Sequence, residues 1–463
     1  MLLTVFKLRS FHVTLFHVAL FFMVLVGLHS FSTRSLGMDE ALGLGPDEYF
    51  KIDINNIGYE NLELIKSDAD IRWWIEADGI LLVLAPTRTA GRLNRVFDVD
   101  RLNISVHEDR LYLMQNFHQK ELERLSIDVL VTAGRMALVQ TKEDGPPRFM
   151  GGTSLYVRPQ QRILQFQPNM VFARQAVNDL PGSPVEFSSE ISDVVNAVDG
   201  NRWFTDVKML TTMNRDAYGE GILKVRDWLE GQFSKILGGL GVQVRHAEFP
   251  LGEAKGFNVI ARVDGSIRPD EIYIVGAHYD ATSEDVAAGT PGAEDNASGT
   301  AGLLEMARAI SKHRPKATLI FVAFSAEEAG LEGSYAYVKQ LISSGERDKV
   351  KGVIVMDMIG YSATDNLACL LETSKSNTPI VNILSAAAKE YAKCRVVTTF
   401  NYFGSDHVPF IDNKFPALLT IDNDWSRYPN YHTTRDTPEY LKIPMAREML
   451  RMNTATIAQW ILN

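Results

Sequence analysis

Short runs of consecutive apolar residues punctuate the second half of the chain. Three of them, Ile272–Ala277, Thr318–Phe324 and Gly352–Met356, are continuous and four to eight residues long. Such runs are typical of strands that are buried on both faces of a parallel sheet. Val242–Phe249 and Phe257–Val263 also have strand character, so five strands are predicted between residues 242 and 356.

Helical patterns lie before, between and after these strands. Apolar residues recur at helical spacing from Ile222 to Ile236, and Gly238-Gly239 end that pattern. The other helix candidates are Ser298–Lys312, Gly333–Ile342, Pro379–Lys393 and Pro444–Ile461. The alternation of strands and helices predicts an α/β domain, with a mixed, mostly parallel open sheet that carries helices on both faces.

The region before this domain has the alternating pattern of β-strands. Leu102–Val106 and Leu111–Leu113 alternate on either side of a polar break, which predicts a hairpin, and Ile127–Val131 and Leu155–Phe166 offer further strands. The Pro- and Gly-containing stretch Leu180–Pro184 reads as a linker. We therefore expect a β-rich domain of unassigned role over residues 46–180 and the α/β domain over residues 185–463.

The N-terminal 45 residues carry a different signal. Lys7 and Arg9 precede an apolar run, Phe11–Phe31, whose length suits a membrane span. The positive flank is N-terminal, so the positive-inside rule places the bulk of the chain outside the cytoplasm. We expect residues 1–45 to be an uncleaved signal-anchor, with a cleaved signal peptide and a secreted or periplasmic enzyme as the alternative.

Composition narrows the class of protein. Of 463 residues, 46% are hydrophobic and 22% charged, which excludes a disordered chain and a multi-pass membrane protein. The net charge is −10, so no basic excess exists to bind nucleic acid. The two cysteines, Cys369 and Cys394, cannot form a thiolate zinc site. In an exported protein we expect them to form a disulfide, with two free thiols as the alternative.

Residues with metal-binding side chains follow each buried run. His278 and Asp280 come after the first, Glu327 and Glu328 after the second, and Asp357 after the third. The carboxyl ends of parallel strands meet at one edge of an open sheet, which is where ligands bind. Two further residues, Asp295 before a predicted helix and His432 far along the chain, can join them at this edge.

The carboxylates gathered at this edge would repel one another in a low-dielectric cleft unless a cation lies between them. Imidazole together with carboxylate oxygens, and without thiolates, points to zinc first, with manganese or cobalt as substitutes. His278 and Asp280 project to the same side of an extended chain, so the carboxylate can orient the imidazole. Glu327 and Glu328 are adjacent and point differently, so one can bind metal while the other serves as a general base.

Six segments match the pattern of a known family in order, spacing and content. They are GAHYD (276–280), EDNASG (294–299), SAEEAGLEGS (325–334), VMDMIGY (355–361), FGSDHVPF (403–410) and YHTTRDTPE (431–439). The chain resembles the M28-type di-zinc aminopeptidases from about residue 190 to the C-terminus. The resemblance says nothing of residues 1–180.

The resemblance implies a role for each matching residue. One zinc would be held by His278, Asp295 and Asp357. The other would be held by Asp295, Glu328 and His432, with Asp295 bridging the two metals. Glu327 would be the general base and Asp280 the residue that orients a ligand. Tyr402 would help to stabilise the oxyanion, and we expect His407 to be structural or pocket-lining rather than a ligand.

The function that follows is an exported exopeptidase that hydrolyses N-terminal residues from peptides, with a metal-bridging hydroxide and Glu327 as general base. A carboxypeptidase of the same superfamily is one alternative, with Arg427 and Arg435 as candidate donors to the substrate carboxylate. A one-zinc glutaminyl cyclase is another, although the intact set of five ligands disfavours it. A membrane-tethered binding module without catalysis is the third, also disfavoured by the intact ligands.

Overall fold

The computed structural model describes residues 46–102, 106–150, 161–175 and 188–463. The chain divides into two compact units, one made of residues 1–74 and 82–103 and the other of residues 75–81 and 104–463. The apolar run Phe11–Phe31 and the predicted linker Leu180–Pro184 lie outside the described residues. Within the described part, no helix is both long and apolar enough to cross a membrane.

The smaller unit is built from short elements. Its strands and helices are β1 (Asp47–Asp53), α3 (Tyr59–Lys66), most of β3 (Ile80–Pro86), α4 (Thr87–Leu93) and β4 (Val99–Arg101). β1 pairs with β4 in antiparallel fashion, and Arg92 of α4 contacts Asp68 at 2.5 Å. This unit contains none of the predicted site residues.

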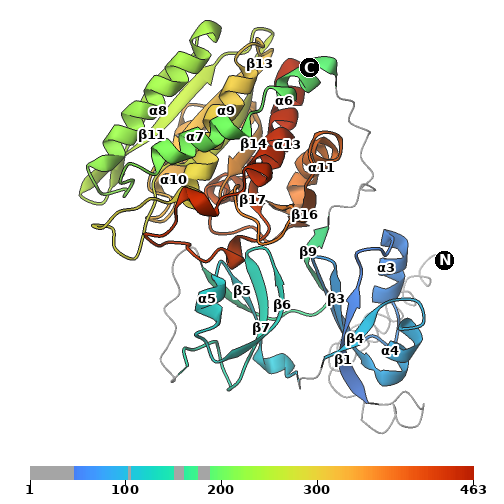
Figure 1. The fold of residues 1–463 in the computed structure, drawn as a ribbon. Helices are drawn as coiled ribbons and strands as arrows, with labels where there is room; N and C mark the ends of the chain where they lie inside the picture. Colours follow the sequence, from blue (N-terminus) through green and yellow to red (C-terminus); the bar gives the residue numbers. More distant parts are fainter. Residues whose placement is uncertain (1–45, 103–105, 151–160, 176–187) are drawn as a thin grey trace, which may run out of the picture. The chain divides into compact units, whose positions relative to one another are not determined.

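The larger unit holds a mixed sheet, shown in Figure 1. In spatial order its strands are β10 (Gln243–Leu251), β11 (Ala254–Val263), β13 (Ala317–Phe324), β12 (Arg268–His278), β14 (Val350–Met356), β17 (Ala417–Asp422), β15 (Ala368–Glu372), β16 (Arg395–Thr399) and β9 (Met170–Gln175), with Ile75–Ala77 of β2 (Trp73–Ala77) beside β9. The central four, β13-β12-β14-β17, are parallel, and β10, β11 and β15 are antiparallel to a neighbour. The predicted mixed, mostly parallel sheet is thus present at its centre.

Helices cover both faces of this sheet. One face carries α6 (Ser189–Asn196), α7 (Gly200–Leu210), α8 (Gly221–Leu237), α9 (Ser298–Ile310), α11 (Thr378–Tyr391) and α13 (Ile443–Leu462), which share one large apolar core with the sheet. The other face carries α10 (Glu332–Ser343) and α12 (His407–Asp412). There Phe324 of β13 lies 6.0 Å from Tyr337 and 6.2 Å from Phe410, between ring centroids. Burial on both faces explains why the central strands are continuously apolar.

A second, smaller sheet belongs to the same unit. Its order is β6 (Ile127–Ala133), β7 (Met136–Thr141), β5 (Leu111–Gln115) and β8 (Arg162–Gln165), with all pairs antiparallel, and α5 (Gln119–Leu122) follows β5. The predicted hairpin of Leu102–Val106 with Leu111–Leu113 is wrong, because β5 lies between β7 and β8. The local alternation suggested that β5 pairs with the segment just before it in sequence. Its partners are instead strands that come later in the chain, because tertiary packing determines the pairing.

The predicted disulfide is also wrong, because Cys369 and Cys394 are free thiols. Cys369 of β15 pairs in register with Val396 of β16, and Cys394 directly precedes β16. Burial raises the pKa of both thiols, to about 12 for Cys394, which keeps them protonated.

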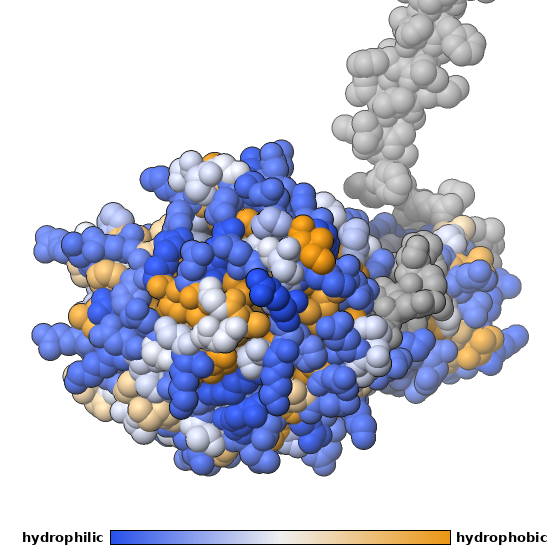
Figure 2. Space-filling view, turned by 90° about the horizontal axis from the view of Figure 1, so that it is seen from above, coloured by the Kyte–Doolittle hydropathy of each residue, from blue (hydrophilic) through white to orange (hydrophobic). Residues whose placement is uncertain are grey.

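The surface of the described part is that of a folded globular protein. Figure 2 shows a face on which hydrophilic residues surround separate apolar patches. Large apolar side chains that are well exposed include Leu64, Val96, Met150, Tyr218 and Ile267, which are scattered along the sequence. Scattered exposure of this kind is ordinary and marks no particular surface.

Candidate metal centre

The sheet brings the predicted site residues to one edge. His278 is the last residue of β12, Asp357 directly follows β14, and Glu327 and Glu328 follow β13. These three parallel strands are neighbours, so their carboxyl ends meet as predicted. Asp295 lies in the turn Ala293–Ala297 that precedes α9.

His432 reaches the same place from a loop that follows the short helix Trp425–Arg427. Its φ angle of 55° lies in the left-handed region. The loop is therefore held in a conformation that non-glycine residues seldom adopt, which is common at functional sites.

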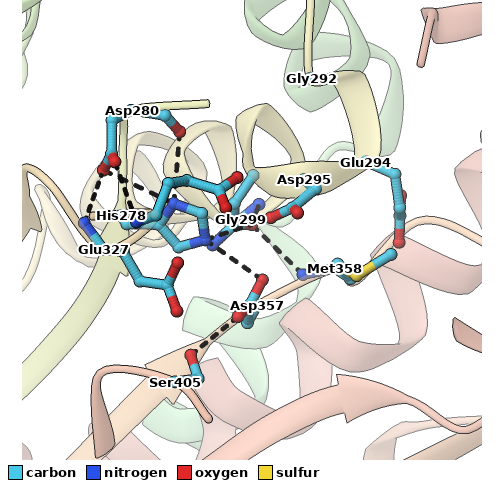
Figure 3. Close-up of polar contacts among 12 residues, drawn as sticks. His278, Asp280, Gly292, Glu294, Asp295, Gly299, Glu327, Asp357, Met358 and Ser405 are labelled. Atoms are coloured by element: carbon cyan, nitrogen blue, oxygen red, sulfur yellow. Dashed lines mark hydrogen bonds and ion pairs between the residues drawn. The ribbon is translucent and has the colours of Figure 1, made fainter. Parts of the chain in front are cut away.

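The distances among these side chains form two groups that share Asp295. His278 Nε2 lies 3.2 Å from Asp295 Oδ1 and 3.4 Å from Asp357 Oδ1. Figure 3 shows these three residues facing one another. His432 Nε2 lies 3.0 Å from Asp295 Oδ2 and 2.9 Å from Glu328 Oε2. The two oxygens of one carboxylate thus face two different imidazoles, as required of a ligand that bridges two metal ions.

These donor atoms fit zinc. A tetrahedral zinc ion with bonds of about 2.0–2.1 Å places its ligand atoms roughly 3.3 Å apart. The four separations, from 2.9 to 3.4 Å, cluster around that value. The donors are imidazole nitrogens and carboxylate oxygens. Those of Asp295, Glu328 and His432 lie within 4.8 Å of one another, as do those of His278, Asp357 and Glu327. This chemistry suits a divalent ion of the zinc type.

Glu327 lies beside the first group. One oxygen of its carboxylate is within 4.8 Å of donor atoms of His278 and Asp357. Burial, reinforced by the charges of Glu328 and Asp357, raises the pKa of Glu327 well above the usual glutamate value. A buried carboxylate with a raised pKa, next to a metal position, has the properties of a general base.

Asp280 holds the two glutamates in place. Its Oδ1 accepts a hydrogen bond from the backbone N–H of Glu327, and its Oδ2 accepts one from that of Glu328, both at 3.2 Å. The predicted contact with the imidazole is looser, since Asp280 Oδ1 lies 3.7 Å from His278 Nδ1. That nitrogen is nearer to the backbone carbonyl of Asp280, at 3.2 Å. Asp280 therefore orients the glutamate pair through its side chain and the histidine mainly through its backbone.

Three supporting residues were not predicted. The Ser405 hydroxyl donates to Asp357 Oδ2 at 2.7 Å, and the Asp436 carboxylate accepts from the backbone N–H groups of Glu294 and Asp295 at 2.9 and 3.1 Å. Both lie in the quoted segments FGSDHVPF and YHTTRDTPE, so their position in those segments was the available signal.

The third supporting residue, Arg215, had no sequence signal. Its buried guanidinium donates to the carbonyls of Tyr279, Pro291 and Gly292 at 2.9, 2.8 and 2.7 Å. It thereby ties together the two loops that carry His278 and Asp295. Burial lowers the pKa of Arg215 to about 10, opposed by the carboxylates of the site.

The ionisable groups perturb one another strongly. Burial alone would lower the pKa of His432, but Glu328 and Asp295 raise it to about 10. Burial opposes ionisation of Asp295, yet hydrogen bonds from His278 and His432 lower its pKa well below the usual range. Buried groups that are driven toward opposite charges in this way are characteristic of functional sites.

A cavity of about 350 Å³ opens onto this cluster. Asp295, Glu327, Glu328, Asp357 and His432 line it. Its apolar lining comes from Met358, Ile421, Trp425 and Tyr431. A polar cluster beside an apolar wall is the usual composition of a small-ligand site.

The structure does not bring Tyr402 to this cavity. Its hydroxyl donates to Asp412 Oδ1 at 3.0 Å, and Tyr402 is not among the described residues that line the cavity. We therefore do not carry its predicted oxyanion role forward. His407 is fully buried at the start of α12, with Nε2 3.2 Å from Glu372 Oε1, and it is in neither metal group.

Comparisons with known proteins place part of this chain in a peptidase family. The model of peptidase family M28 matches residues 258–457. A probable leucine aminopeptidase of Trichophyton verrucosum is 28% identical over 59% of this chain and 76% of its own length. A probable zinc metalloprotease of Pyrenophora tritici-repentis is 35% identical over 34% of each chain, so this chain matches about a third of that relative.

Solved structures show the same fold. The aminopeptidase LapA of Legionella pneumophila superposes with a TM-score of 0.54 at 19% identity, covering 76% of this chain and 99% of LapA. The residues of both ligand groups lie within residues 258–457. Residues 258–457 therefore belong to peptidase family M28, and the chain carries a metallopeptidase domain.

Proposed function

We propose that this protein is a zinc-dependent aminopeptidase that uses two divalent metal ions to remove N-terminal residues from peptides. One observation carries the proposal: the two oxygens of Asp295 face His278 and His432 separately, at 3.2 and 3.0 Å. That arrangement supports a bridging carboxylate between two metal positions. His278 and Asp357 would complete the ligands of one ion, and Glu328 and His432 would complete those of the other.

When bound, the two ions supply Lewis acidity at the scissile carbonyl and at the attacking water. Glu327 then acts as the general base. Its carboxylate accepts the proton of the water and later donates it to the nitrogen of the leaving amine. Asp280 keeps this carboxylate in place by holding the backbone N–H groups of Glu327 and Glu328.

The lining of the cavity supports a preference for an apolar N-terminal residue. Met358, Ile421, Trp425 and Tyr431 offer an apolar surface beside the ligand groups. Burial of an apolar side chain there contributes about 1.5–3 kcal/mol of binding for a residue of leucine size. The name of the Trichophyton verrucosum relative, a probable leucine aminopeptidase, agrees with that preference.

The alternatives find less support. A carboxypeptidase needs a cation that faces the substrate carboxylate, yet Arg427 and Arg435 are more than half exposed and are not among the described residues lining the cavity. Arg135 does line it, but its guanidinium already donates to the carbonyls of Phe403 and Gly404. A one-zinc glutaminyl cyclase would need only one of the two ligand groups, and a non-catalytic module would need neither.

Hydrolysis of aminoacyl-anilides tests the proposal. We expect release of aniline from leucyl-anilide, faster than from glutamyl-anilide, and no release when the α-amine is acetylated. Cleavage of an N-acetylated peptide at its free C-terminus would instead establish a carboxypeptidase. Conversion of N-terminal glutamine to a cyclic product without release of a residue would establish a cyclase.

We also propose that the metallopeptidase domain lies outside the cytoplasm, tethered by an uncleaved N-terminal segment. Lys7 and Arg9 ahead of the apolar run Phe11–Phe31 support this orientation. A reporter fused to the C-terminus should report an extracytoplasmic location. A cytoplasmic signal would contradict the proposal, and recovery of a shortened, detergent-free chain would favour a cleaved leader.

A further inference from the structure

The small sheet β6-β7-β5-β8 contributes directly to the catalytic cavity. Asn116 follows β5, Arg135 lies in the turn between β6 and β7, and Gln161 precedes β8, and all three line the cavity. The register explains why they lie together, since Gln115 pairs with both Met136 and Arg162. We call Asn116, Arg135 and Gln161 the polar wall.

The polar wall is internally braced. Arg135 Nε donates to Asn116 Oδ1 at 3.2 Å, and Gln161 Nε2 donates to the Asn116 carbonyl at 3.2 Å. Gln161 Nε2 also donates to Glu121 Oε2 at 3.1 Å. Each of the three residues is at most 7% exposed. A buried network of this kind is rigid, because moving one member breaks the hydrogen bonds of the others.

The small sheet is also tied to the loops that carry the metal centre. Arg135 donates to the carbonyls of Phe403 and Gly404 at 2.9 and 2.8 Å, next to the Ser405 that holds Asp357. The Arg135 guanidinium stacks over the Phe403 ring at 4.5 Å. These contacts fix the polar wall relative to one metal position.

A second set of contacts reaches the loop of His432. Lys120 Nζ donates to the Pro429 carbonyl at 2.6 Å, and His118 Nε2 contacts the carbonyl of Tyr428. The His118 ring stacks on Tyr431 with centroids 5.8 Å apart. The polar wall is therefore anchored to both halves of the metal centre and does not behave as a mobile lid.

The loop Thr282–Glu284 forms another part of the cavity lining. It too is fastened, because Glu284 accepts hydrogen bonds from the backbone N–H and hydroxyl of Thr434 at 2.6 and 3.2 Å. The space between these fixed parts is about 350 Å³, near the lower end of the roughly 300–1,000 Å³ of pockets that enclose drug-sized ligands. A ligand of that size corresponds to a peptide of two or three residues.

We propose that the small sheet limits this enzyme to short peptides, and that the residues after the scissile bond meet the polar wall. The inference rests on the proposed aminopeptidase function and names its substrate class. Peptides of two or three residues fit between the metal centre and the polar wall. Longer peptides collide with Asn116, Arg135 and Gln161, which cannot move aside.

The test compares kcat/KM for leucinamide, Leu-Gly, Leu-Gly-Gly and a leucine peptide of six residues. We expect the six-residue peptide to fall about tenfold or more below Leu-Gly-Gly, the size of effect that a steric mismatch in a pocket produces. Equal values for short and long peptides would overturn the inference and leave the aminopeptidase proposal intact. No turnover of leucinamide or any of the peptides would overturn both.

Variants of Gln161 assign the effect to the polar wall. In Gln161→Ala, kcat/KM for the six-residue peptide should rise relative to kcat/KM for Leu-Gly-Gly. In Gln161→Trp, kcat/KM for Leu-Gly-Gly should fall relative to kcat/KM for leucinamide. Gln165→Trp is the matched control, because Gln165 lies on the same strand β8 but is exposed and outside the described cavity lining. The inference would be overturned if Gln165→Trp changed these kcat/KM ratios as much as Gln161→Trp does. It would also be overturned if neither Gln161 variant changed them.

Discussion

At the scale of single residues, the metal centre depends on side chains that hold the ligands as much as on the ligands. The Ser405 hydroxyl fixes one oxygen of Asp357, and the Asp280 carboxylate fixes the backbone of both glutamates. Sequence reasoning proposed His278, Glu328 and Asp357 as ligands because they lie at the ends of buried strands, and it added Asp295 and His432 through the matched family segments. It missed Ser405, Asp436 and Arg215 as supports, because their hydrogen bonds join segments far apart in sequence.

Ser405→Ala tests this support directly. The substitution removes a hydrogen bond of 2.7 Å to a carboxylate, so Asp357 should become free to rotate. Loss of such an outer partner typically costs about 10- to 100-fold in metal affinity. Competition with a chromophoric chelator measures the change. Ser343→Ala is the control, since Ser343 is exposed at the end of α10, and equal affinities in the two variants would contradict the role of Ser405.

His118 gives a pH-dependent prediction. Burial is the largest effect on its pKa and lowers it below 6.5, so the folded protein favours the neutral ring. Because the folded pKa is below the unfolded one, this contribution to stability is present above about pH 6.5 and is lost as pH falls further.

His118→Asn should therefore flatten the decline of Tm between pH 7 and pH 5. Asparagine keeps an acceptor for the N-cap of α5, where the His118 side chain accepts from the backbone N–H of Lys120. Parallel slopes of Tm against pH for the variant and the wild type would show that the His118 ring does not contribute in this way.

At the scale of elements, the contact of α10 with the end of β13 positions the two glutamates. Gly333, near the start of α10, has no room for a side chain. A Cβ there would lie 2.2 Å from the Ser325 carbonyl oxygen, two residues before Glu327. The close approach of helix and strand therefore requires glycine at this position.

Gly333→Ala should shift this junction and destabilise the protein by about 1–3 kcal/mol, the usual cost of overpacking. It should also lower kcat, because Glu327 moves with the strand end. Gly231→Ala is the matched control. Gly231 lies within α8 with open space around it, so alanine there should stabilise by roughly 0.5–1 kcal/mol. Denaturant unfolding measures the free energy of unfolding of both variants. Equal stability of Gly333→Ala and Gly231→Ala would contradict the requirement for glycine at position 333.

The elements themselves were predictable where local pattern and tertiary environment agree. The buried strands β12, β13 and β14 and the helices α8 to α11 and α13 appear close to their predicted bounds. β15, β16 and β17 were not predicted from the sequence. The hairpin assigned to Leu111–Leu113 was wrong because β5 is paired on both sides by strands that follow much later in the chain.

At the scale of the whole molecule, metal binding and folding should be linked. A ligand that binds only the folded chain stabilises it, by about 4 kcal/mol at a thousandfold excess over Kd. Removal of metal by a chelator should lower Tm and abolish activity, and zinc should restore both. An unchanged Tm on complete metal removal, measured by elemental analysis, would contradict a metal centre that joins five residues from five separate segments.

The participation of the small sheet in the cavity could not be predicted from sequence. Residues 104–175 carry no chemical motif, and the place of Asn116, Arg135 and Gln161 follows only from strand register and from contacts with loops near residues 403 and 428. Three of the proposed metal ligands, His278, Glu328 and Asp357, follow in contrast from one rule about strand ends. The residue types of the metal site could thus be predicted from the sequence, and the shape of the cavity around it could not.

The central claim is that Glu327 is a general base beside two metal ions and not one of their ligands. Zinc content and kcat of Glu327→Gln, measured on the same preparation, test it most directly. Glutamine keeps the size and polarity of the side chain but cannot accept the proton of the water, and loss of a general base costs on the order of 10²–10⁴ in rate. We predict two zinc ions per chain with kcat reduced by that factor; loss of the zinc, or near-full activity, would contradict the account.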